Sequence, residues 1–531
     1  MKAFWEIIHR IAEKIIEIAV FLLFGCITLS GAFSSAVLED GYGQKLFFVR
    51  DSLFLNLLFC TVSGILIHFL VKMICKDQEK RSRILLVITL LYTFLLSLGW
   101  AAVSKCFPTA DQASVYYGAK HFAAGNFSEI TDKYSYFSCY PHQMGLALFY
   151  EILLRLFHTE SYHLLQGVNA VCNVITVLSL YEITRILFPG KKVSVYFLFL
   201  VLFCLPLFWY TPFVYGELPS FAFSFLGVWM LLAGIQKKGK ESLPFLGLSL
   251  LALTGASAVR KNTLILVIAV VLTLTVYLFK ERKPFYLIYV ILLAVFCGGA
   301  ILLAVRYYED RSGSSLNDGV PGISHLVMGL QEAEYAPGWY NGFNFETYAN
   351  AADYDQREAV RISRQAFRER LKAFSEDPAY AFRFFFDKFR AEWLNTGYAC
   401  YDSTAGKYYE RHPAVESLYS GAGFFITRFF MDKYQFLIYF TALFFVARRL
   451  FAKNPKRDMF SGGLLLYTLP AAVLGGALFY LAWEGSGRYI LPYFVMTLPY
   501  AAAGMDLLDA GIDVMYNKKS KRKTGMQEVY Q

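Results

Sequence analysis

Residues 83–104 read RILLVITLLYTFLLSLGWAAVS, an apolar run whose only charged residue is the first one, Arg83. A helix rises about 1.5 Å per residue and the hydrocarbon core of a bilayer is about 30 Å thick, so a run of this length is typical of a membrane-spanning helix. Similar runs recur along most of the 531-residue sequence. The pattern predicts an all-α polytopic membrane protein.

The composition agrees with this interpretation. Hydrophobic residues make up 56% of the chain, charged residues make up 17%, and the mean hydropathy is +0.41. Soluble globular domains carry about 25% charged residues. We expect about twelve spanning helices, at approximately residues 15–36, 53–75, 83–104, 161–186, 193–211, 217–235, 243–259, 263–279, 284–305, 434–451, 459–482 and 489–508.

Several helices are expected outside these spans. The apolar segment 144–157 is too short to cross a bilayer comfortably, and we interpret it as an interfacial or re-entrant helix. Residues 114–124 predict a short helix that ends at Gly125, because glycine commonly follows a last helical turn. Residues 354–374 predict a charged helix, and Asp377-Pro378 is typical of the start of an aromatic helix on the membrane surface.

The basic residues indicate the orientation of the chain. They gather in alternate connections between the spans, around residues 76–83, 191–192, 237–240, 280–283 and 448–457, and again in the tail at 518–523. Because basic loops stay in the cytoplasm, both termini are predicted to be cytoplasmic. This bias and anionic lipid headgroups account for the net charge of +10 without a nucleic-acid partner.

Two extracytoplasmic segments divide the predicted chain. Residues 1–305 form an N-terminal transmembrane module with a first outside loop at 105–160, and residues 306–433 form an extracytoplasmic helical region. Residues 434–510 hold the last spans, and residues 511–531 form a basic cytoplasmic tail.

Asp111 lies in the first of these outside loops, directly after a span. A carboxylate at the boundary of so apolar a protein is a candidate for chemistry there. Glu217 begins a later span on the same side. It either caps its own helix, where a carboxylate favours the local dipole, or faces the same cavity as Asp111.

Three cations also fall on the outer side, against the positive-inside bias. Arg260 and Lys261 join two spans, and either snorkel to lipid phosphates or hold a phosphate themselves. Arg488 joins the last two spans, and either pairs with Glu484 or binds phosphate oxygens through its forked guanidinium.

Carboxylates and cations in one site suit a transfer reaction with a phosphate leaving group. A carboxylate accepts the proton of an attacking hydroxyl, and cations neutralise the charge that develops on the phosphate. Outer aromatic residues such as Trp339, Tyr340, Trp393 and Trp483 either stack on sugar rings or belong to an interfacial belt.

The motifs that carry these residues resemble the GT-C glycosyltransferases. They are Ala110-Asp111-Gln112, Tyr140-Pro141-His142-Gln143, Tyr215-Gly216-Glu217, Arg260-Lys261-Asn262 and Gly487-Arg488-Tyr489. The likeness is to bacterial members related to protein O-mannosyltransferases and to the aminoarabinose transferase of lipid A. It is clearest over residues 100–270 and 483–495.

The resemblance implies a bacterial plasma-membrane enzyme that transfers a sugar, with inversion, from a polyprenyl-phosphate donor to an extracytoplasmic glycan, lipid or protein. Asp111 would be the catalytic base and Glu217 the second acidic residue. Arg260, Lys261 and Arg488 would contact the donor phosphate, and Tyr140, His142, Trp339 and Tyr489 are weaker candidates for binding the acceptor or the sugar. A divalent metal remains open as a cofactor, although Gln112 replaces the second of two adjacent acids often found in relatives.

Two other functions compete with this prediction. A lipid or oligosaccharide flippase or transporter also needs charges at membrane depth, but the interiors of most predicted spans lack ionisable residues. A polysaccharide polymerase of the outer face would be expected to carry key arginines in two large outside loops. The Asp111 loop has no arginine between Pro108 and Gln143.

Overall fold

The computed structural model describes residues 2–75, 80–281, 285–451 and 463–529. Within these ranges, 11 helices are long and apolar enough to cross a membrane, so the predicted all-α polytopic fold is confirmed. They are formed by α1 (Lys2–Phe33), α2 (Leu53–Cys75), α3 (Lys80–Ser104), α8 (Tyr162–Leu187), α11 (Glu217–Gln236), α12 (Leu243–Val259), α13 (Leu264–Glu281), α14 (Phe285–Ser312), α21 (Ala422–Leu450), α22 (Thr468–Ala482) and α23 (Gly487–Val529). The spans of α12, α13 and α22 begin in the 3-10 turns that precede them, η2 (Gly239–Ser242), η3 (Lys261–Thr263) and η6 (Gly463–Tyr467).

The segment predicted as the fifth span is broken. Residues 193–211 form α9 (Lys191–Leu202) and the short α10 (Leu205–Trp209), which are separated by Phe203 and Cys204. Pro206 lies in the first turn of α10, where a missing backbone N–H is tolerated, and it would have interrupted a continuous helix. The chain then runs irregularly to α11.

Side chains of α8 supply the hydrogen bonds that this break requires. Asn169 donates to the carbonyls of Thr211 and Phe213, both at 3.0 Å, and Asn173 donates to the carbonyl of Leu207 at 3.2 Å. Irregular backbone at membrane depth is tolerated only where the protein satisfies its polar groups. The pairing fixes the segment that leads into Glu217.

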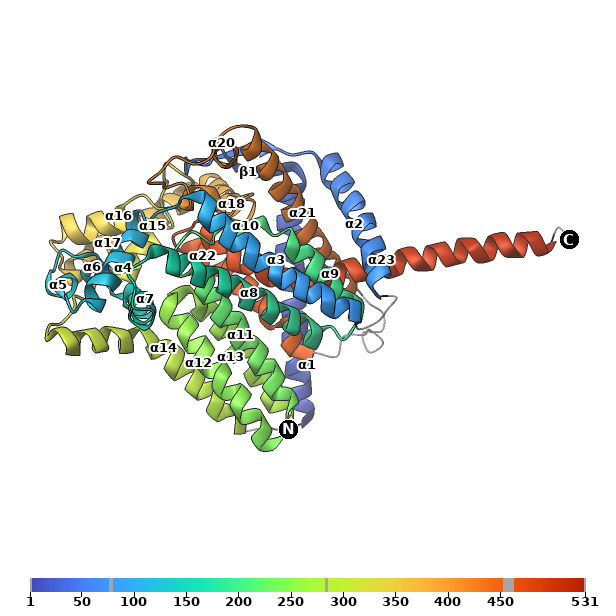
Figure 1. The fold of residues 1–531 in the computed structure, drawn as a ribbon, viewed down its shortest axis with the longest axis horizontal. Coiled ribbons are helices and arrows are strands. Elements are labelled where there is room, and N and C mark those ends of the chain that lie inside the picture. Colours follow the sequence, from blue (N-terminus) through green and yellow to red (C-terminus); the bar gives the residue numbers. More distant parts are fainter. Residues whose placement is uncertain (1, 76–79, 282–284, 452–462, 530–531) are drawn as a thin grey trace.

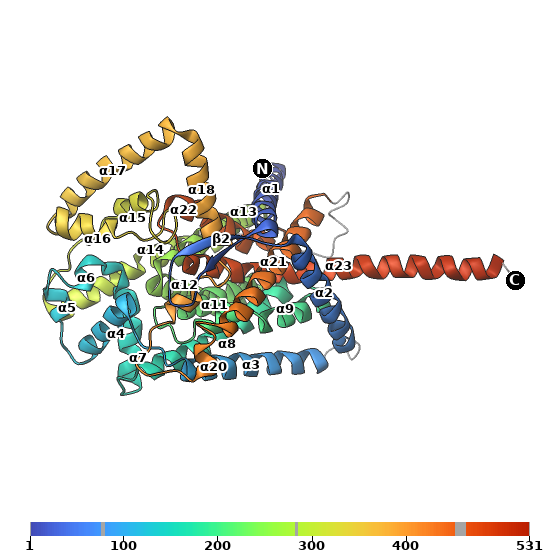
Figure 2. The same cartoon turned by 90° about the horizontal axis from the view of Figure 1, so that it is seen from above.

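A helical region covers one end of the bundle, toward the left and the top of Figure 1. Its elements are α4 (Ala110–Ala123), α5 (Ser128–Thr131), α6 (Tyr136–Cys139), the 3-10 turn η1 (Pro141–Gln143), α7 (Met144–Leu156), α15 (Gly322–Met328), α16 (Phe343–Phe345), η4 (Glu346–Ala351), α17 (Gln356–Glu376), α18 (Pro378–Trp393), α19 (Cys400–Ser403) and α20 (Pro413–Glu416). Figure 2 shows α17 and α18 as the two arms of a bend. Asp377 caps α18 as predicted, because its side chain accepts from the backbone N–H of Tyr380 at 2.9 Å.

Several boundaries differ from the predictions. Helix α4 begins at Ala110 and not at residue 114, so Asp111 lies in its first turn. Helices α14 and α21 run through the predicted domain boundaries at 305/306 and 433/434. The unpredicted strands β1 (Ser34–Leu38) and β2 (Leu46–Arg50) form an antiparallel hairpin. This hairpin joins the end of α18, because the N–H of Ala36 donates to the carbonyl of Leu394 at 3.0 Å.

Several of the basic residues that predict the orientation lie outside the described residues. Of the predicted cytoplasmic cations, Lys76, Arg282, Lys283, Lys453, Lys456 and Arg457 lie there, as do the side chains of the basic tail from residue 511 onward. The orientation of the termini therefore stays a prediction.

Helices α21 and α23 approach closely at Gly504, where a Cβ would lie 1.9 Å from the carbonyl oxygen of Thr441. We expect Gly504→Ala to lower the thermal unfolding midpoint in detergent, because the backbones must separate and such overpacking costs about 1–3 kcal/mol. Gly298→Ala is the matched control, since nothing lies within 4 Å of a Cβ there. Equal midpoints for the two variants would contradict this packing.

Candidate functional site

A cavity of about 470 Å³ opens between the helical region and the ends of the spanning helices. Its walls come from the start of α4, from η1 and from the segments 213–215, 259–262, 335–344, 399–403 and 484–489. The predicted site residues among its lining are Asp111, Tyr140, His142, Arg260, Lys261, Trp339, Arg488 and Tyr489. The structure thus brings together eight of the nine residues singled out from the sequence.

Glu217, the ninth, lies just behind this cavity. Its carboxylate is 2.9 Å from the guanidinium of Arg260 and 3.6 Å from that of Arg488, and its side chain is 3% exposed. Gly216, which precedes it, has a φ of +89°, and a Cβ there would approach Leu146 and Val259 at 3.0 Å. Glycine thus permits the turn that directs Glu217 toward the two arginines.

This arrangement excludes two of the alternatives left open by the sequence, the pairing of Arg488 with Glu484 and the extension of Arg260 toward lipid. Arg488 pairs with Glu217 and not with Glu484, which instead lies 3.2 Å from Nδ1 of His325. Arg260 does not extend toward lipid, because it also donates to the carbonyl of Tyr215 at 3.3 Å. Both guanidiniums lie over the ring of Tyr215, at 5.0 and 5.3 Å from its centroid.

Asp111 lies on the cavity wall with its side chain exposed to the cavity. Its Oδ2 accepts a hydrogen bond from the hydroxyl of Tyr215 at 3.2 Å. The surrounding protein raises the pKa of Asp111, and Arg488 together with the Tyr215 hydrogen bond opposes that rise. A carboxylate with a raised pKa and a free oxygen suits proton transfer.

Gln112, next in the chain, has a structural role. It is 2% exposed, and its Oε1 accepts from the hydroxyl of Tyr162 at 2.9 Å and from the backbone N–H of Val214 at 3.3 Å. It therefore fixes the start of α4 to the irregular segment before α11.

The remaining predicted residues occupy different parts of the cavity. Lys261 is exposed, whereas Trp339 is 6% exposed and Tyr489 donates to Glu484 at 3.4 Å. Burial and the nearby cations lower the pKa of His142 to about 3, so its imidazole is neutral at physiological pH. Tyr140 packs against His142, with ring centroids 6.0 Å apart.

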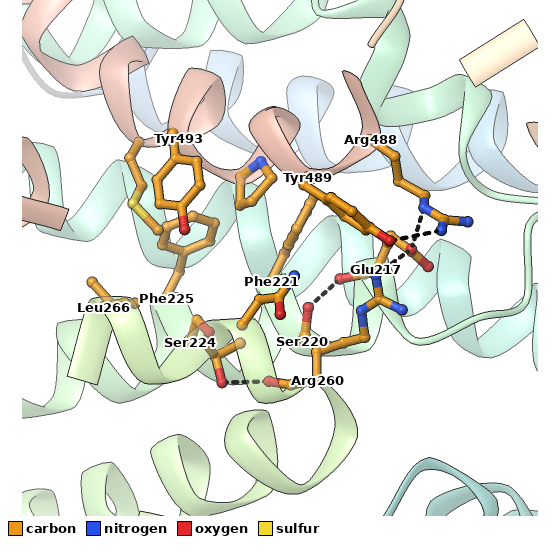
Figure 3. Close-up of a pocket in the computed structure, with 14 residues that line it drawn as sticks. Glu217, Ser220, Phe221, Ser224, Phe225, Arg260, Leu266, Arg488, Tyr489 and Tyr493 are labelled. Carbon is orange, nitrogen blue, oxygen red and sulfur yellow. Dashed lines mark hydrogen bonds and ion pairs between the residues drawn. The ribbon is translucent and has the colours of Figure 1, made fainter. Parts of the chain in front are cut away.

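A narrow, mostly apolar cleft continues from the cavity between α11, α13 and α23. It shares Arg260, Asn262, Arg488 and Tyr489 with the cavity. Its deeper wall is apolar, and Figure 3 shows Phe221, Phe225, Leu266 and Tyr493 around it. Arg260 and Arg488 therefore lie at the junction between the polar cavity and the apolar cleft.

Sequence reasoning missed Asp402, which lines the cavity from α19. Burial raises the pKa of Asp402 to about 7, and Arg488 opposes the rise. The backbone before it is strained, since Tyr398 and Ala399 have φ values of 50° and 59°. Such strain clusters at functional sites. No sequence pattern around Asp402 signals this position.

Lys388 was not predicted as a site residue either, yet it supports the cavity wall. Its buried Nζ donates to the carbonyls of Gly329 at 2.6 Å and Trp483 at 2.7 Å. It thereby holds the end of α15 beside the segment with Glu484, and the backbone N–H of Gly485 in that segment donates to the carbonyl of Gly338 at 2.8 Å. Within the part of the chain that the structure describes, no group of three or more His, Cys, Asp or Glu is placed to hold a metal ion.

Comparison with curated proteins gave no match, and neither did comparison with solved structures. Residues 8–506 match the family described as conserved hypothetical integral membrane protein. Because this match covers nearly the whole chain, the protein belongs to that family of integral membrane proteins.

Proposed function

We propose that the protein is a membrane glycosyltransferase of the GT-C kind, which transfers a sugar from a polyprenyl-phosphate donor to a glycan, lipid or protein acceptor outside the cytoplasm. The observation that carries the proposal is the junction at Arg260 and Arg488, where the polar cavity meets the apolar cleft. A lipid-linked phosphate has the same division into a charged head and an apolar chain.

The charges at the junction support phosphate binding. Glu217 orients both arginines but neutralises only one of them, so the cluster keeps a net positive charge. Exposed Lys261 adds another positive charge at the same wall. Guanidinium groups held in this way bind phosphate oxygens through forked, charge-assisted hydrogen bonds.

Asp111 is the proposed base. An acceptor hydroxyl attacks the anomeric carbon from the side opposite the phosphate, and its proton passes to the carboxylate of Asp111. The bond between the anomeric carbon and the phosphate oxygen breaks with its electron pair, and the released phosphate is stabilised by Arg260 and Arg488. Attack from the opposite side inverts the anomeric centre.

The aromatic and acidic residues of the cavity provide the proposed contacts for the sugar and the acceptor. Trp339 and Tyr489 line the cavity as the aromatic candidates, and Glu484, beside Tyr489 and His325, offers a hydrogen-bond acceptor. Tyr140 and His142 line the wall on the side of η1. Membrane lipids surround the apolar helices.

Asp111→Asn is expected to abolish sugar transfer while donor binding stays nearly intact, because the amide keeps the shape of the side chain but accepts no proton. Purified protein in nanodiscs would be incubated with a panel of polyprenyl-phosphate sugars, and donor consumption would be measured. Asp310→Asn, which changes an exposed carboxylate away from the cavity, is the control. Full transfer by Asp111→Asn would exclude Asp111 as the base.

Arg260→Ala is expected to weaken donor binding by roughly 10-fold or more, since hydrogen bonds to charged groups contribute about 1.5–3 kcal/mol. Arg260→Lys keeps the charge without the fork, and we expect an intermediate affinity. Arg361→Ala removes an exposed cation that pairs with Glu358, and it should bind the donor normally. Unchanged affinity of Arg260→Ala for a polyprenyl phosphate would rule out its role at the phosphate.

Anion binding at the junction is expected to strengthen as the pH falls from 8 to 6. The pKa of Asp402 is raised to about 7, so below this pH the residue loses the negative charge that opposes an anion at Arg488. Farnesyl sulfate is a suitable probe because its charge is constant over this range, and calorimetry would give its affinity. Asp402→Asn should bind more tightly than the wild type at pH 8 and respond less to pH. An Asp402→Asn profile identical to that of the wild type would contradict this coupling.

A further inference from the structure

Gln143 lies behind the proposed base and takes no direct part in the reaction described above. It ends η1 and is 7% exposed. Its Nε2 donates to the hydroxyl of Tyr215 at 2.8 Å, and this hydroxyl donates to Oδ2 of Asp111 at 3.2 Å. The hydroxyl of Tyr136 is the third group at Tyr215, at 2.9 Å.

The donor and acceptor capacities of these groups determine the direction of every bond. A phenol has one hydrogen and two lone pairs, and an amide nitrogen only donates. The single hydrogen of Tyr215 goes to Asp111, because an ionised carboxylate only accepts. Tyr136 must then donate to Tyr215, whose two lone pairs are filled by Gln143 and Tyr136.

The orientation of the Gln143 amide decides whether this arrangement exists. With its oxygen toward Tyr215, the amide would accept the phenolic hydrogen and withdraw it from Asp111. His142 fits this orientation when its hydrogen is on Nδ1: its Nε2 lies 3.5 Å from Nε2 of Gln143, and in that neutral tautomer Nε2 is the acceptor. The cations Arg260 and Lys261 help to keep His142 neutral.

We propose that Gln143 is a positioning residue. Its amide fixes the direction of donation along a hydrogen-bond relay from Gln143 through Tyr215 to Asp111. Oδ1 of Asp111 is then the atom that accepts the substrate proton. The assignment of Oδ1 to substrate rests on the proposed transferase function. The direction of the relay does not, since it rests on the hydrogen bonds among Gln143, Tyr215 and ionised Asp111 and on the orientation of the Gln143 amide.

Other charged and titratable groups also act on Asp111. Arg488 and Arg260 stabilise its ionised form, whereas Glu484 opposes it. Tyr140 and Tyr340 face it as further phenols of the cavity. None of these residues is changed in the variants below, so their effects cancel between the variants.

The test compares two substitutions with their combination. Gln143→Glu keeps the shape of the side chain, but its carboxylate accepts the hydrogen of Tyr215 and takes it from Asp111. Tyr215→Phe removes that hydrogen directly. The pKa of Asp111 would be measured by infrared difference titration against Asp111→Asn, which requires no transfer activity. Each single variant should move the titration of Asp111 to higher pH, by about one pH unit.

The double variant Gln143→Glu/Tyr215→Phe separates the relay from simple charge repulsion. If Gln143 acts through Tyr215, the two shifts in the pKa of Asp111 are strongly non-additive. Once Tyr215→Phe has removed the hydroxyl, Gln143→Glu can no longer take its hydrogen away from Asp111. Fully additive shifts would overturn the proposal. Gln143→Leu removes the donor without adding charge, and it should raise the pKa of Asp111 less than Gln143→Glu does. An equally large rise would contradict the proposed direction of donation in the relay.

The pH at which sugar transfer falls on the acid side should rise among the variants in the same order as the pKa of Asp111. Donor consumption in nanodiscs would be measured for each variant across the titration range. If no polyprenyl-phosphate sugar is consumed by the wild type while the infrared shifts are non-additive, the transferase proposal fails and the relay stands. If transfer occurs and the shifts are additive, the relay fails and the transferase proposal stands.

Discussion

The ion cluster of Glu217 with Arg260 and Arg488 is the interaction on which the rest of the site depends. It joins the start of α11, the turn between α12 and α13, and the start of α23. Removing charges from water is costly, and removing one partner of such a cluster leaves another charge buried and unpaired. The cluster therefore holds three helix ends in one relative position, and the cavity and the cleft meet at that position.

The irregular segment before α11 connects this cluster to the proposed base. Asn169 and Asn173 of α8 donate hydrogen bonds to carbonyl groups of the broken segment. Gln112 connects the start of α4 to Val214, because its side chain accepts from the N–H of Val214. Tyr215 then lies between the arginines and Asp111, with its ring under the guanidiniums and its hydroxyl on the carboxylate. The proposed phosphate site and the proposed base are thus positioned by one short piece of chain.

The sequence predicted that the unusual charges gather at one end of the helical bundle, and it predicted the helical fold. Asp111, Arg260 and Arg488 could be found because charges beside long apolar runs stand out. The pairing of Arg488 with Glu217 and not with Glu484 could not be found, because it depends on the break after α9 and on the turn at Gly216. Asp402 was missed for a related reason: its position follows from the tertiary packing of α19, and no local periodicity marks it.

The central claim is that the junction between the cavity and the cleft receives a lipid-linked phosphate. An electron cryomicroscopy map of the protein in nanodiscs with a bound polyprenyl phosphate tests this most directly. We predict phosphate density within hydrogen-bond distance of Arg260 and Arg488, with the lipid chain along Phe221, Phe225 and Leu266. Phosphate density at any other part of the protein, with the junction closed by the arginines and Glu217 alone, would contradict the claim.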